Sequence, residues 1–187
     1  MELNYIQEIL GGNVSRFSYF VTTYKDMAYS VAFRIVKNNE DAEEIVQDSF
    51  VKAYKALHKF RKESKFSTWF YRIVVNNALT RKKAISYQVS DANSSEISNV
   101  QMEEIESAYK NLTQLERQKF INNALEKIPE EDSLLLTLFY LNENSIEEIS
   151  EITGISKGNL KMKLLRAREK MYLALQKSLK FEIQSLL

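Results

Sequence analysis

The 187-residue sequence contains no cysteine and only one histidine, His58. Without cysteine, neither a disulfide framework nor a thiolate metal site can form. A single histidine excludes His-based catalytic triads and metal sites built from several histidines. The four glycines are too few and too scattered to build a phosphate-binding loop of either common type. This residue supply argues against an enzyme, and we expect neither a metal nor a cofactor.

Membrane signals are also lacking. The N-terminal residues have no basic and apolar regions of the kind found in a signal peptide, and no apolar run approaches the length of a membrane span. The chain is nevertheless 44% apolar, so it can fill one or two cores. We therefore expect a cytoplasmic protein with no direct membrane insertion.

The formal net charge is only +1, but the charges are sorted into blocks. Residues 58–83 hold eight Lys or Arg against one acid, and residues 157–180 hold eight against one. Residues 126–151 show the reverse balance, with eight acids and one Lys. The near-neutral total therefore hides two basic surfaces, each suited to weak and salt-dependent binding of nucleic acid.

Residues 144–170 carry the signals of two short helices joined by a tight turn. Ser145 and Glu148 have the spacing of a capping box, which marks a helix start. Gly154 supplies the left-handed conformation that commonly ends a helix. Apolar residues at helical spacing predict one buried face on the second helix, and its lysines lie on the other side. The pattern predicts a helix-turn-helix, in which a basic second helix can enter a major groove. A helical hairpin with a merely solvated basic face is the alternative.

Residues 60–83 form the other basic segment, a polar loop followed by a helix. We expect Phe60 on an exposed loop, where aromatic and basic side chains together suit unstacked bases. Asn76 and Asn77 are poor helix formers in mid-helix, and their amides can read base edges or satisfy nearby backbone. This segment is a candidate for binding single-stranded nucleic acid.

The remaining sequence predicts further helices over 3–10, 14–37, 41–57, 115–128 and 130–141. Residues 86–112 are rich in Ser, Asn and Glu with little periodicity, which indicates a flexible linker. We therefore expect an all-α protein with helical domains at 1–85 and 113–187. The helix from residue 41 has an acidic stripe, which in isolation is usually just a solvated face.

Together these motifs resemble the extracytoplasmic-function (ECF) group of sigma factors in the sigma-70 family of bacterial RNA polymerase. The segment 41–50, DAEEIVQDSF, is similar to the region 2 helix that docks on the polymerase clamp. The segment 66–76, FSTWFYRIVVN, is similar to the part that recognises the melted −10 element. The segments 128–131, 145–150 and 158–168 resemble region 4, which reads the −35 element as duplex. The three blocks occur in the family's order and spacing.

The resemblance implies a sigma factor that binds core RNA polymerase at its clamp and flap regions and assists promoter melting. It also implies promoter DNA as a second partner and an anti-sigma factor as a third. The polymerase-binding residues would be Asp41, Glu44, Gln47 and Asp48. The −10 residues would be Phe60, Arg61, Ser64, Lys65, Arg72, Asn76 and Asn77. The −35 residues would be Lys157, Asn159, Lys161, Met162, Lys163, Leu165 and Arg166.

Two other classes of binding protein remain open on the residues alone. A stand-alone helix-turn-helix regulator would form a stable dimer and bind duplex DNA tightly without polymerase. A helical interaction protein would use its basic faces on acidic protein surfaces and would not bind DNA. Unlike a sigma factor, neither of these two proteins would need RNA polymerase in order to bind its partner.

Overall fold

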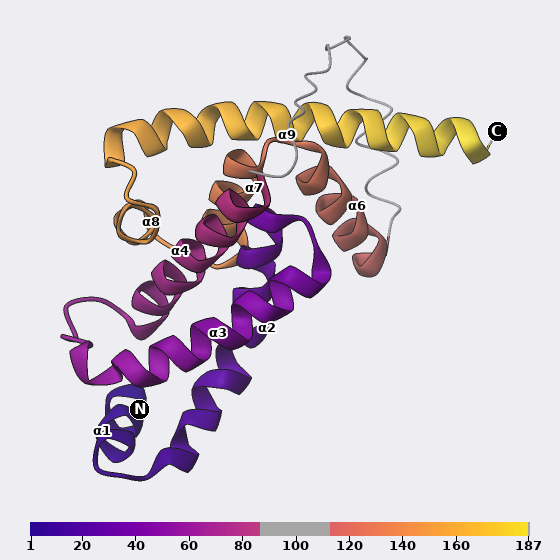
Figure 1. Ribbon diagram of the computed structural model, residues 1–187. Coiled ribbons are helices and arrows are strands. Elements are labelled where there is room, and N and C mark those ends of the chain that lie inside the picture. Colours follow the sequence, from indigo (N-terminus) through magenta and orange to yellow (C-terminus); the bar gives the residue numbers. More distant parts are fainter. Residues whose placement is uncertain (87–112, 187) are drawn as a thin grey trace.

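The computed structural model describes residues 1–86 and 113–186, and all regular structure in those ranges is helical (Figure 1). The all-α prediction is thereby confirmed. The first group of helices covers residues 2–86 and the second covers residues 114–186. In chain order the elements are α1 (Glu2–Leu10), η1 (Val14–Arg16), α2 (Phe17–Val36), α3 (Asn39–Ala56), η2 (Leu57–Lys59), α4 (Phe66–Ser86), α6 (Gln114–Lys127), α7 (Glu130–Leu136), η3 (Thr137–Leu141), α8 (Ile146–Thr153) and α9 (Lys157–Leu186).

Local sequence signals set the helix boundaries of the first group. Gly12 takes φ 105°, which favours glycine and lets the chain turn between α1 and α2. The Asn38 side chain accepts a hydrogen bond from the backbone N–H of Asp41 and caps α3, whose first-turn acids suit the positive end of the helix. Helices α2, α3 and α4 pack on one another around apolar side chains that the helical periodicity predicted.

The second group begins with two helices separated by the single proline of the chain. Thr113 and Glu116 form a capping box at the start of α6. Pro129 precedes α7, where its missing N–H removes no helical hydrogen bond. The predicted helix 130–141 is present, but its last turn, η3, is π-helical. A π turn has a wider repeat than an α-helix, and Leu141 at its end is 42% exposed, although its spacing from Leu134 and Leu138 is that of one helical face.

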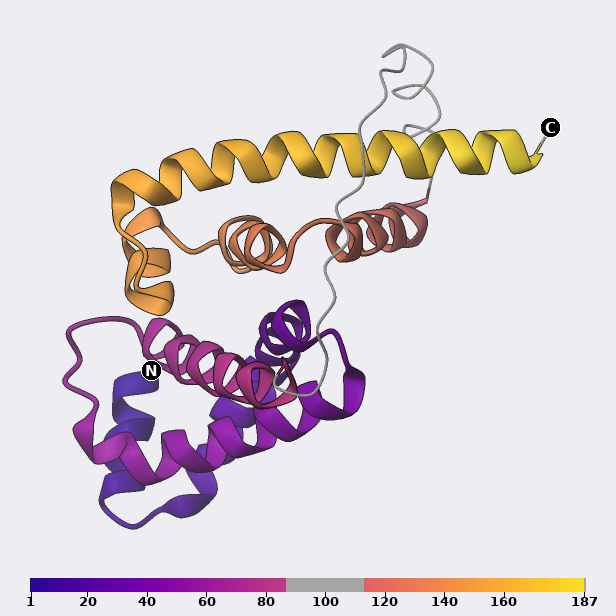
Figure 2. The same cartoon turned by 45° about the horizontal axis from the view of Figure 1, so that its top comes forward.

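The two groups lie against each other as two layers (Figure 2). Helix α8 packs on α4, and α7 packs on α2. The long helix α9 runs along the outer side of the second group, over α6 and α7. Apolar residues from both groups belong to one continuous buried cluster.

The predicted linker 86–112 lies, apart from Ser86, outside the described residues. Within the described residues, no helix is long and apolar enough to cross a membrane. The same part of the chain contains no cluster of three or more His, Cys, Asp or Glu side chains that could hold a metal ion.

Candidate nucleic-acid and protein-binding surfaces

The helix-turn-helix predicted over 144–170 is formed by α8 and α9. Glu148 accepts a hydrogen bond from the backbone N–H of Ser145 at 2.8 Å, and the Ser145 hydroxyl accepts one from the Glu148 N–H at 3.2 Å. Gly154 ends α8 in the left-handed conformation, at φ 75°. The Ser150 hydroxyl donates to the Ile155 carbonyl at 2.7 Å across the turn. These short-range bonds fix the angle at which α9 leaves the turn.

Helix α9 has a buried face and an exposed basic face. Leu160, Leu164 and Ala167 are buried, as their spacing predicted. Among the predicted −35 residues, Met162 and Leu165 are about half exposed, and the Lys163 ammonium lies 2.5 Å from the carboxylate of Glu131. The exposed set is Lys157, Asn159, Lys161, Met162, Leu165 and Arg166. A rigid helix with cations and polar groups on its outer face has the form needed to enter a major groove.

The segment before and within α4 differs in part from its prediction. Phe60 was expected on an exposed loop, but its ring is only 9% exposed and packs against the rings of Phe66 and Trp69. An apolar ring gains more by joining this aromatic cluster than by staying in water. Arg61, Lys65 and Arg72 are exposed, and the Lys65 ammonium lies 2.9 Å from the carboxylate of Glu148 on α8. Ser64 is half-buried in the same loop.

Asn76 and Asn77 have different surroundings. Asn76 is exposed on α4. Asn77 is half-buried, donates to the Ser49 hydroxyl at 2.8 Å and accepts from the Lys52 ammonium at 2.6 Å. Both partners of Asn77 belong to α3. The Asn77 amide therefore joins two helices, and of the two asparagines only Asn76 is exposed.

The acidic stripe lies on the outer side of α3 and is joined to α4. Glu44, Gln47 and Asp48 are exposed, and Asp41 is half-buried. The guanidinium of Arg81 on α4 bonds to Asp41 and Glu44. The sequence does not predict this role, because Arg81 belongs to the basic segment 58–83, whose charge suggests contact with nucleic acid. The pairing places a positive charge inside an otherwise acidic surface.

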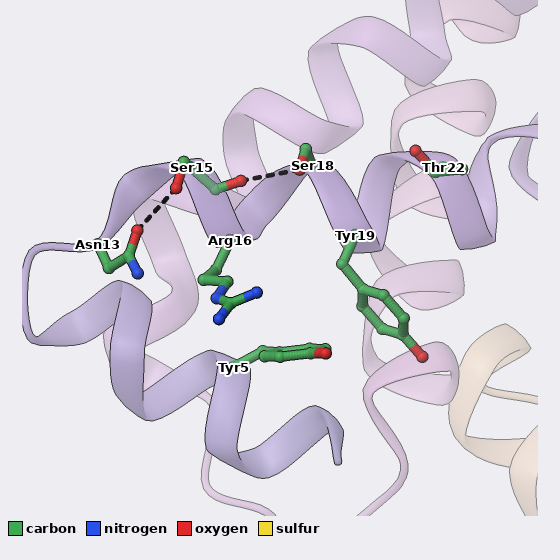
Figure 3. Close-up of a pocket in the computed structure, with 7 residues that line it drawn as sticks. All are labelled: Tyr5, Asn13, Ser15, Arg16, Ser18, Tyr19 and Thr22. Carbon is green, nitrogen blue, oxygen red and sulfur yellow. Dashed lines mark hydrogen bonds between the residues drawn. The ribbon is translucent and has the colours of Figure 1, made fainter.

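A hollow beside α1 offers no comparable surface (Figure 3). It is lined by Tyr5, Asn13, Ser15, Arg16, Ser18, Tyr19 and Thr22. The Arg16 guanidinium lies over the Tyr5 ring, 5.1 Å from its centroid, and bonds to Glu8 at 2.7 Å. The Ser15 hydroxyl donates to Asn13 at 2.7 Å. Since these polar groups bond to protein atoms, we assign the hollow no ligand.

Comparison with known proteins matches both halves of this architecture. Residues 20–86 match the family model for sigma-70 region 2, and residues 119–171 match that for sigma-70 region 4. SigW, an ECF RNA polymerase sigma factor of Bacillus subtilis, is 30% identical over 181 residues, which cover 94% of this chain and 95% of SigW. The chain belongs to the ECF sigma factors. The ECF sigma-E factor of Escherichia coli K12 is 31% identical over 173 residues, covering 88% of each chain.

Solved structures show that this ECF sigma factor has the fold of other sigma factors. CnrH, determined in complex with the cytosolic domain of CnrY, aligns with a TM-score of 0.64 at 19% identity and covers 92% of this chain and 96% of that one. RpoE of Bartonella quintana, determined with the anti-sigma factor NepR, aligns with a TM-score of 0.63 at 20% identity and covers 86% and 96%. Within this sigma factor, the region 2 match contains most of α2 and all of α3 and α4, and the region 4 match contains α8 and the first half of α9.

Proposed function

We propose that this ECF sigma factor binds core RNA polymerase and directs it to promoters by reading two DNA elements. The observation that carries the proposal is a capped helix-turn-helix whose basic face is open, in the same chain as a second basic segment that adjoins an acidic helix. Each basic surface is small and binds DNA weakly by itself. When one polymerase holds both, the second contact becomes intramolecular and the overall affinity rises without new contacts.

For polymerase binding we assign the outer face of α3. Asp41, Glu44, Gln47 and Asp48 would meet the clamp, because three of the four are exposed and the face is acidic. The second group of helices would meet the flap region. Charge complementarity of this kind speeds encounter and rejects wrong partners.

For the −10 element we assign the loop before α4 and the exposed side of α4. Arg61, Lys65 and Arg72 would contact phosphate, and Asn76 would read a base edge. Phe60 and Ser64 would form the floor and wall of a site for an extruded base. Capturing such a base offsets the few kcal/mol needed to unstack it and traps the open strand. Asn77 would support this site by holding α4 to α3.

For the −35 element we assign the N-terminal half of α9. Lys161, Met162, Leu165 and Arg166 would face the bases and phosphates of the major groove, with Lys157, Asn159 and Lys163 beside them.

We propose domain limits of 1–85 and 113–187, joined by a linker over 86–112. We further infer that the protein acts in the cytoplasm, is held by an anti-sigma factor when idle, and catalyses no covalent step.

The test is transcription in vitro with core polymerase from the source bacterium and fragments of its genome. We expect defined transcripts that require this chain and start at sites preceded by shared −10 and −35 sequences. The chain carrying Asp48→Arg is the matched control for core binding. Absence of any chain-dependent transcript, or tight binding of duplex operators by a dimer of the chain alone, would contradict the proposal.

A further inference from the structure

Arg168 on α9 makes a contact that none of the surfaces assigned above uses. Its guanidinium lies over two aromatic rings, 5.6 Å from the centroid of Phe139 and 5.6 Å from that of Tyr140. Both rings belong to η3, and their centroids are 4.9 Å apart. A cation at this distance is attracted to the face of a ring. Arg168 is therefore held in place beside η3, although the residue itself is exposed.

The π-helical turn brings two successive rings to one cation. Its hydrogen bonds join residues i and i+5, as in the bond from the Asn142 N–H to the Thr137 carbonyl at 3.0 Å. A π turn has more residues per turn than an α-helix, so successive side chains leave its axis closer together. Phe139 is half-buried and Tyr140 is 54% exposed. The two rings form a cradle for Arg168 at the surface of the protein.

The charge of Arg168 has no acidic partner, unlike the charges of three lysines on the same helix. Each of these lysines pairs with a carboxylate of α7 or α8. The pairs are Lys157–Glu147 at 2.9 Å, Lys163–Glu131 at 2.5 Å and Lys170–Asp132 at 2.6 Å. In the described part of the chain, no carboxylate lies within ion-pair distance of Arg168. The rings contact only the face of the guanidinium, so its N–H edge is open to an external anion.

Arg166 and Arg168 lie on opposite edges of the exposed face of α9. They flank Ala167, which is buried. Residues two apart in an α-helix leave its axis about 160° apart, and Lys161, about two turns before Arg168, shares the Arg168 edge. A helix with its side chains is about 10 to 12 Å across, and the major groove is about 12 Å wide. A helix in the groove therefore has one DNA strand at each edge.

We propose that Arg168 binds a backbone phosphate of the −35 element, on the strand opposite to the one that Arg166 contacts. Phe139 and Tyr140 are positioning residues, because they hold the guanidinium in place before DNA arrives and so reduce the freedom lost on binding. A guanidinium suits this ligand, since two of its N–H groups match two phosphate oxygens. The inference rests on the proposed function, because it adds a residue to the −35 surface assigned there.

Removing the charge of Arg168 should weaken promoter binding and its dependence on salt. The probe is a duplex promoter fragment that yields a chain-dependent transcript, bound by core polymerase carrying the full chain. Each phosphate contact adds about 0.9 to the slope of log affinity against log salt concentration. Arg168→Met keeps an unbranched side chain over the rings, so we expect a slope shallower by about one and an affinity about three- to tenfold lower.

The matched control is Lys119→Met, which removes one charge from an exposed site on α6. Equal slopes for Arg168→Met and Lys119→Met would overturn the proposal. Arg168→Lys keeps the charge and should keep the slope. A contact that only stabilised the fold would lower the free energy of unfolding of Arg168→Met in urea without changing the slope, and that result would also overturn the proposal.

Neutral phosphates locate the contact on the DNA. Each fragment carries a single methylphosphonate, which removes the charge of one phosphate in or beside the −35 element. At one position this change should weaken binding by the unaltered chain but not by Arg168→Met. A position on the other strand should lose its effect in Arg166→Met. Sensitivity of Arg168→Met at every position would overturn the phosphate contact, and a shared strand for the two arginines would overturn their assignment to opposite strands.

A double-mutant cycle tests the aromatic cradle. Tyr140→Leu should weaken promoter binding about two- to fivefold in the unaltered chain. In a chain that already carries Arg168→Met, the same change should have no further effect, because Tyr140 acts through Arg168. Equal losses in the two backgrounds would overturn the positioning role of Tyr140.

The results separate this inference from the proposed function. A chain that directs no transcription would contradict the proposed function, and this inference would fall with it. Promoter binding that depends on Lys161 and Arg166 but not on Arg168 would overturn this inference alone.

Discussion

Arg81 on α4 and Asp41 on α3 are joined by a charged hydrogen bond, with Arg81 Nε 2.8 Å from Asp41 Oδ1. The neighbouring terminal nitrogen lies 2.9 Å from a carboxylate oxygen of Glu44. The hydrogen bond to Asp41, followed by the charges of Asp41 and Glu44, raises the pKa of Arg81. One cation of the basic segment 58–83 thus pairs with two of the acids that we assign to polymerase binding.

Replacing Arg81 should change how fast the sigma factor meets polymerase. Arg81→Gln removes a positive charge that competes for Asp41 and Glu44, so we expect the association rate with core polymerase to rise severalfold at low salt. Stopped-flow fluorescence with labelled core measures this rate. Lys25→Gln makes the same charge change on α2 and should leave the rate nearly unchanged. A slower rate for Arg81→Gln would mean that Arg81 itself contacts the polymerase.

Reversing the charge at Asp48 should weaken core binding. Asp48 is exposed on α3, so Asp48→Arg introduces repulsion without disturbing the core. We expect a loss of affinity of about tenfold or more, measured by biolayer interferometry, with an unchanged thermal unfolding midpoint. Asp26→Arg, at an exposed position of α2, is the control. Unchanged affinity for Asp48→Arg would remove Asp48 from the polymerase-binding face.

Removing two cations from α9 should impair promoter use alone. Lys161→Ala with Arg166→Ala should lower transcription from a cognate promoter. The slope of log affinity against log salt concentration for DNA binding by the holoenzyme should become shallower by about two. Core affinity should stay the same. The pair Lys25→Ala with Lys119→Ala removes equal charge from exposed sites on α2 and α6. If both double variants lowered transcription equally, the loss would come from the lower net charge of the protein and not from DNA contacts made by Lys161 and Arg166.

Alanine substitutions at Asn77 and Asn76 should have different effects, the first on the free energy of unfolding and the second on promoter opening. Asn77→Ala removes hydrogen bonds to Ser49 and Lys52. It should therefore lower the free energy of unfolding by about 1 to 2 kcal/mol in urea titrations. Asn76→Ala, at an exposed site, should change it by less than about 0.5 kcal/mol and should reduce promoter opening. The reverse order of stabilities would contradict these assignments.

Acid should weaken the contact between α4 and α8 through Glu148. Burial raises the pKa of Glu148, but hydrogen bonds from Ser145 and the Lys65 ammonium outweigh this, so the pKa ends below its ordinary value of 4.5. A carboxylate with a lowered pKa stabilises the folded form above its ordinary pKa, and this contribution is lost as the pH falls through the lowered value. The free energy of unfolding should therefore be constant near pH 7 and fall below about pH 4.5, as urea titrations at several pH values would measure. Glu148→Gln should reduce this dependence, and an unchanged profile would exclude Glu148 as its source.

Sequence predicted those parts of the structure that depend on near neighbours. The Ser145 capping box, the turn at Gly154 and the buried Leu160 and Leu164 each follow from residues within one or two helical turns. Phe60 was misplaced because its burial depends on the rings of Phe66 and Trp69 across a loop. The exposure of a loop residue cannot be predicted from its polar neighbours alone.

The contact between the two groups of helices could not be predicted. Lys65 and Glu148 are 83 residues apart, and no local pattern links them. The one usable signal was the succession of a basic block at 58–83 and an acidic block at 126–151. That signal suggested nucleic acid for the first block, although two of its cations, Lys65 and Lys82, pair with acids of the second block.

Helix α9 extends well past the residues proposed to face DNA, as one unbroken helix from Lys157 to Leu186. Helices α6, α7 and α8 all pack on α9. A displacement of α6 or α7 would therefore also shift the N-terminal part of α9, which belongs to the same helix. The orientation of the proposed −35 residues thus depends on helices that do not themselves face the DNA.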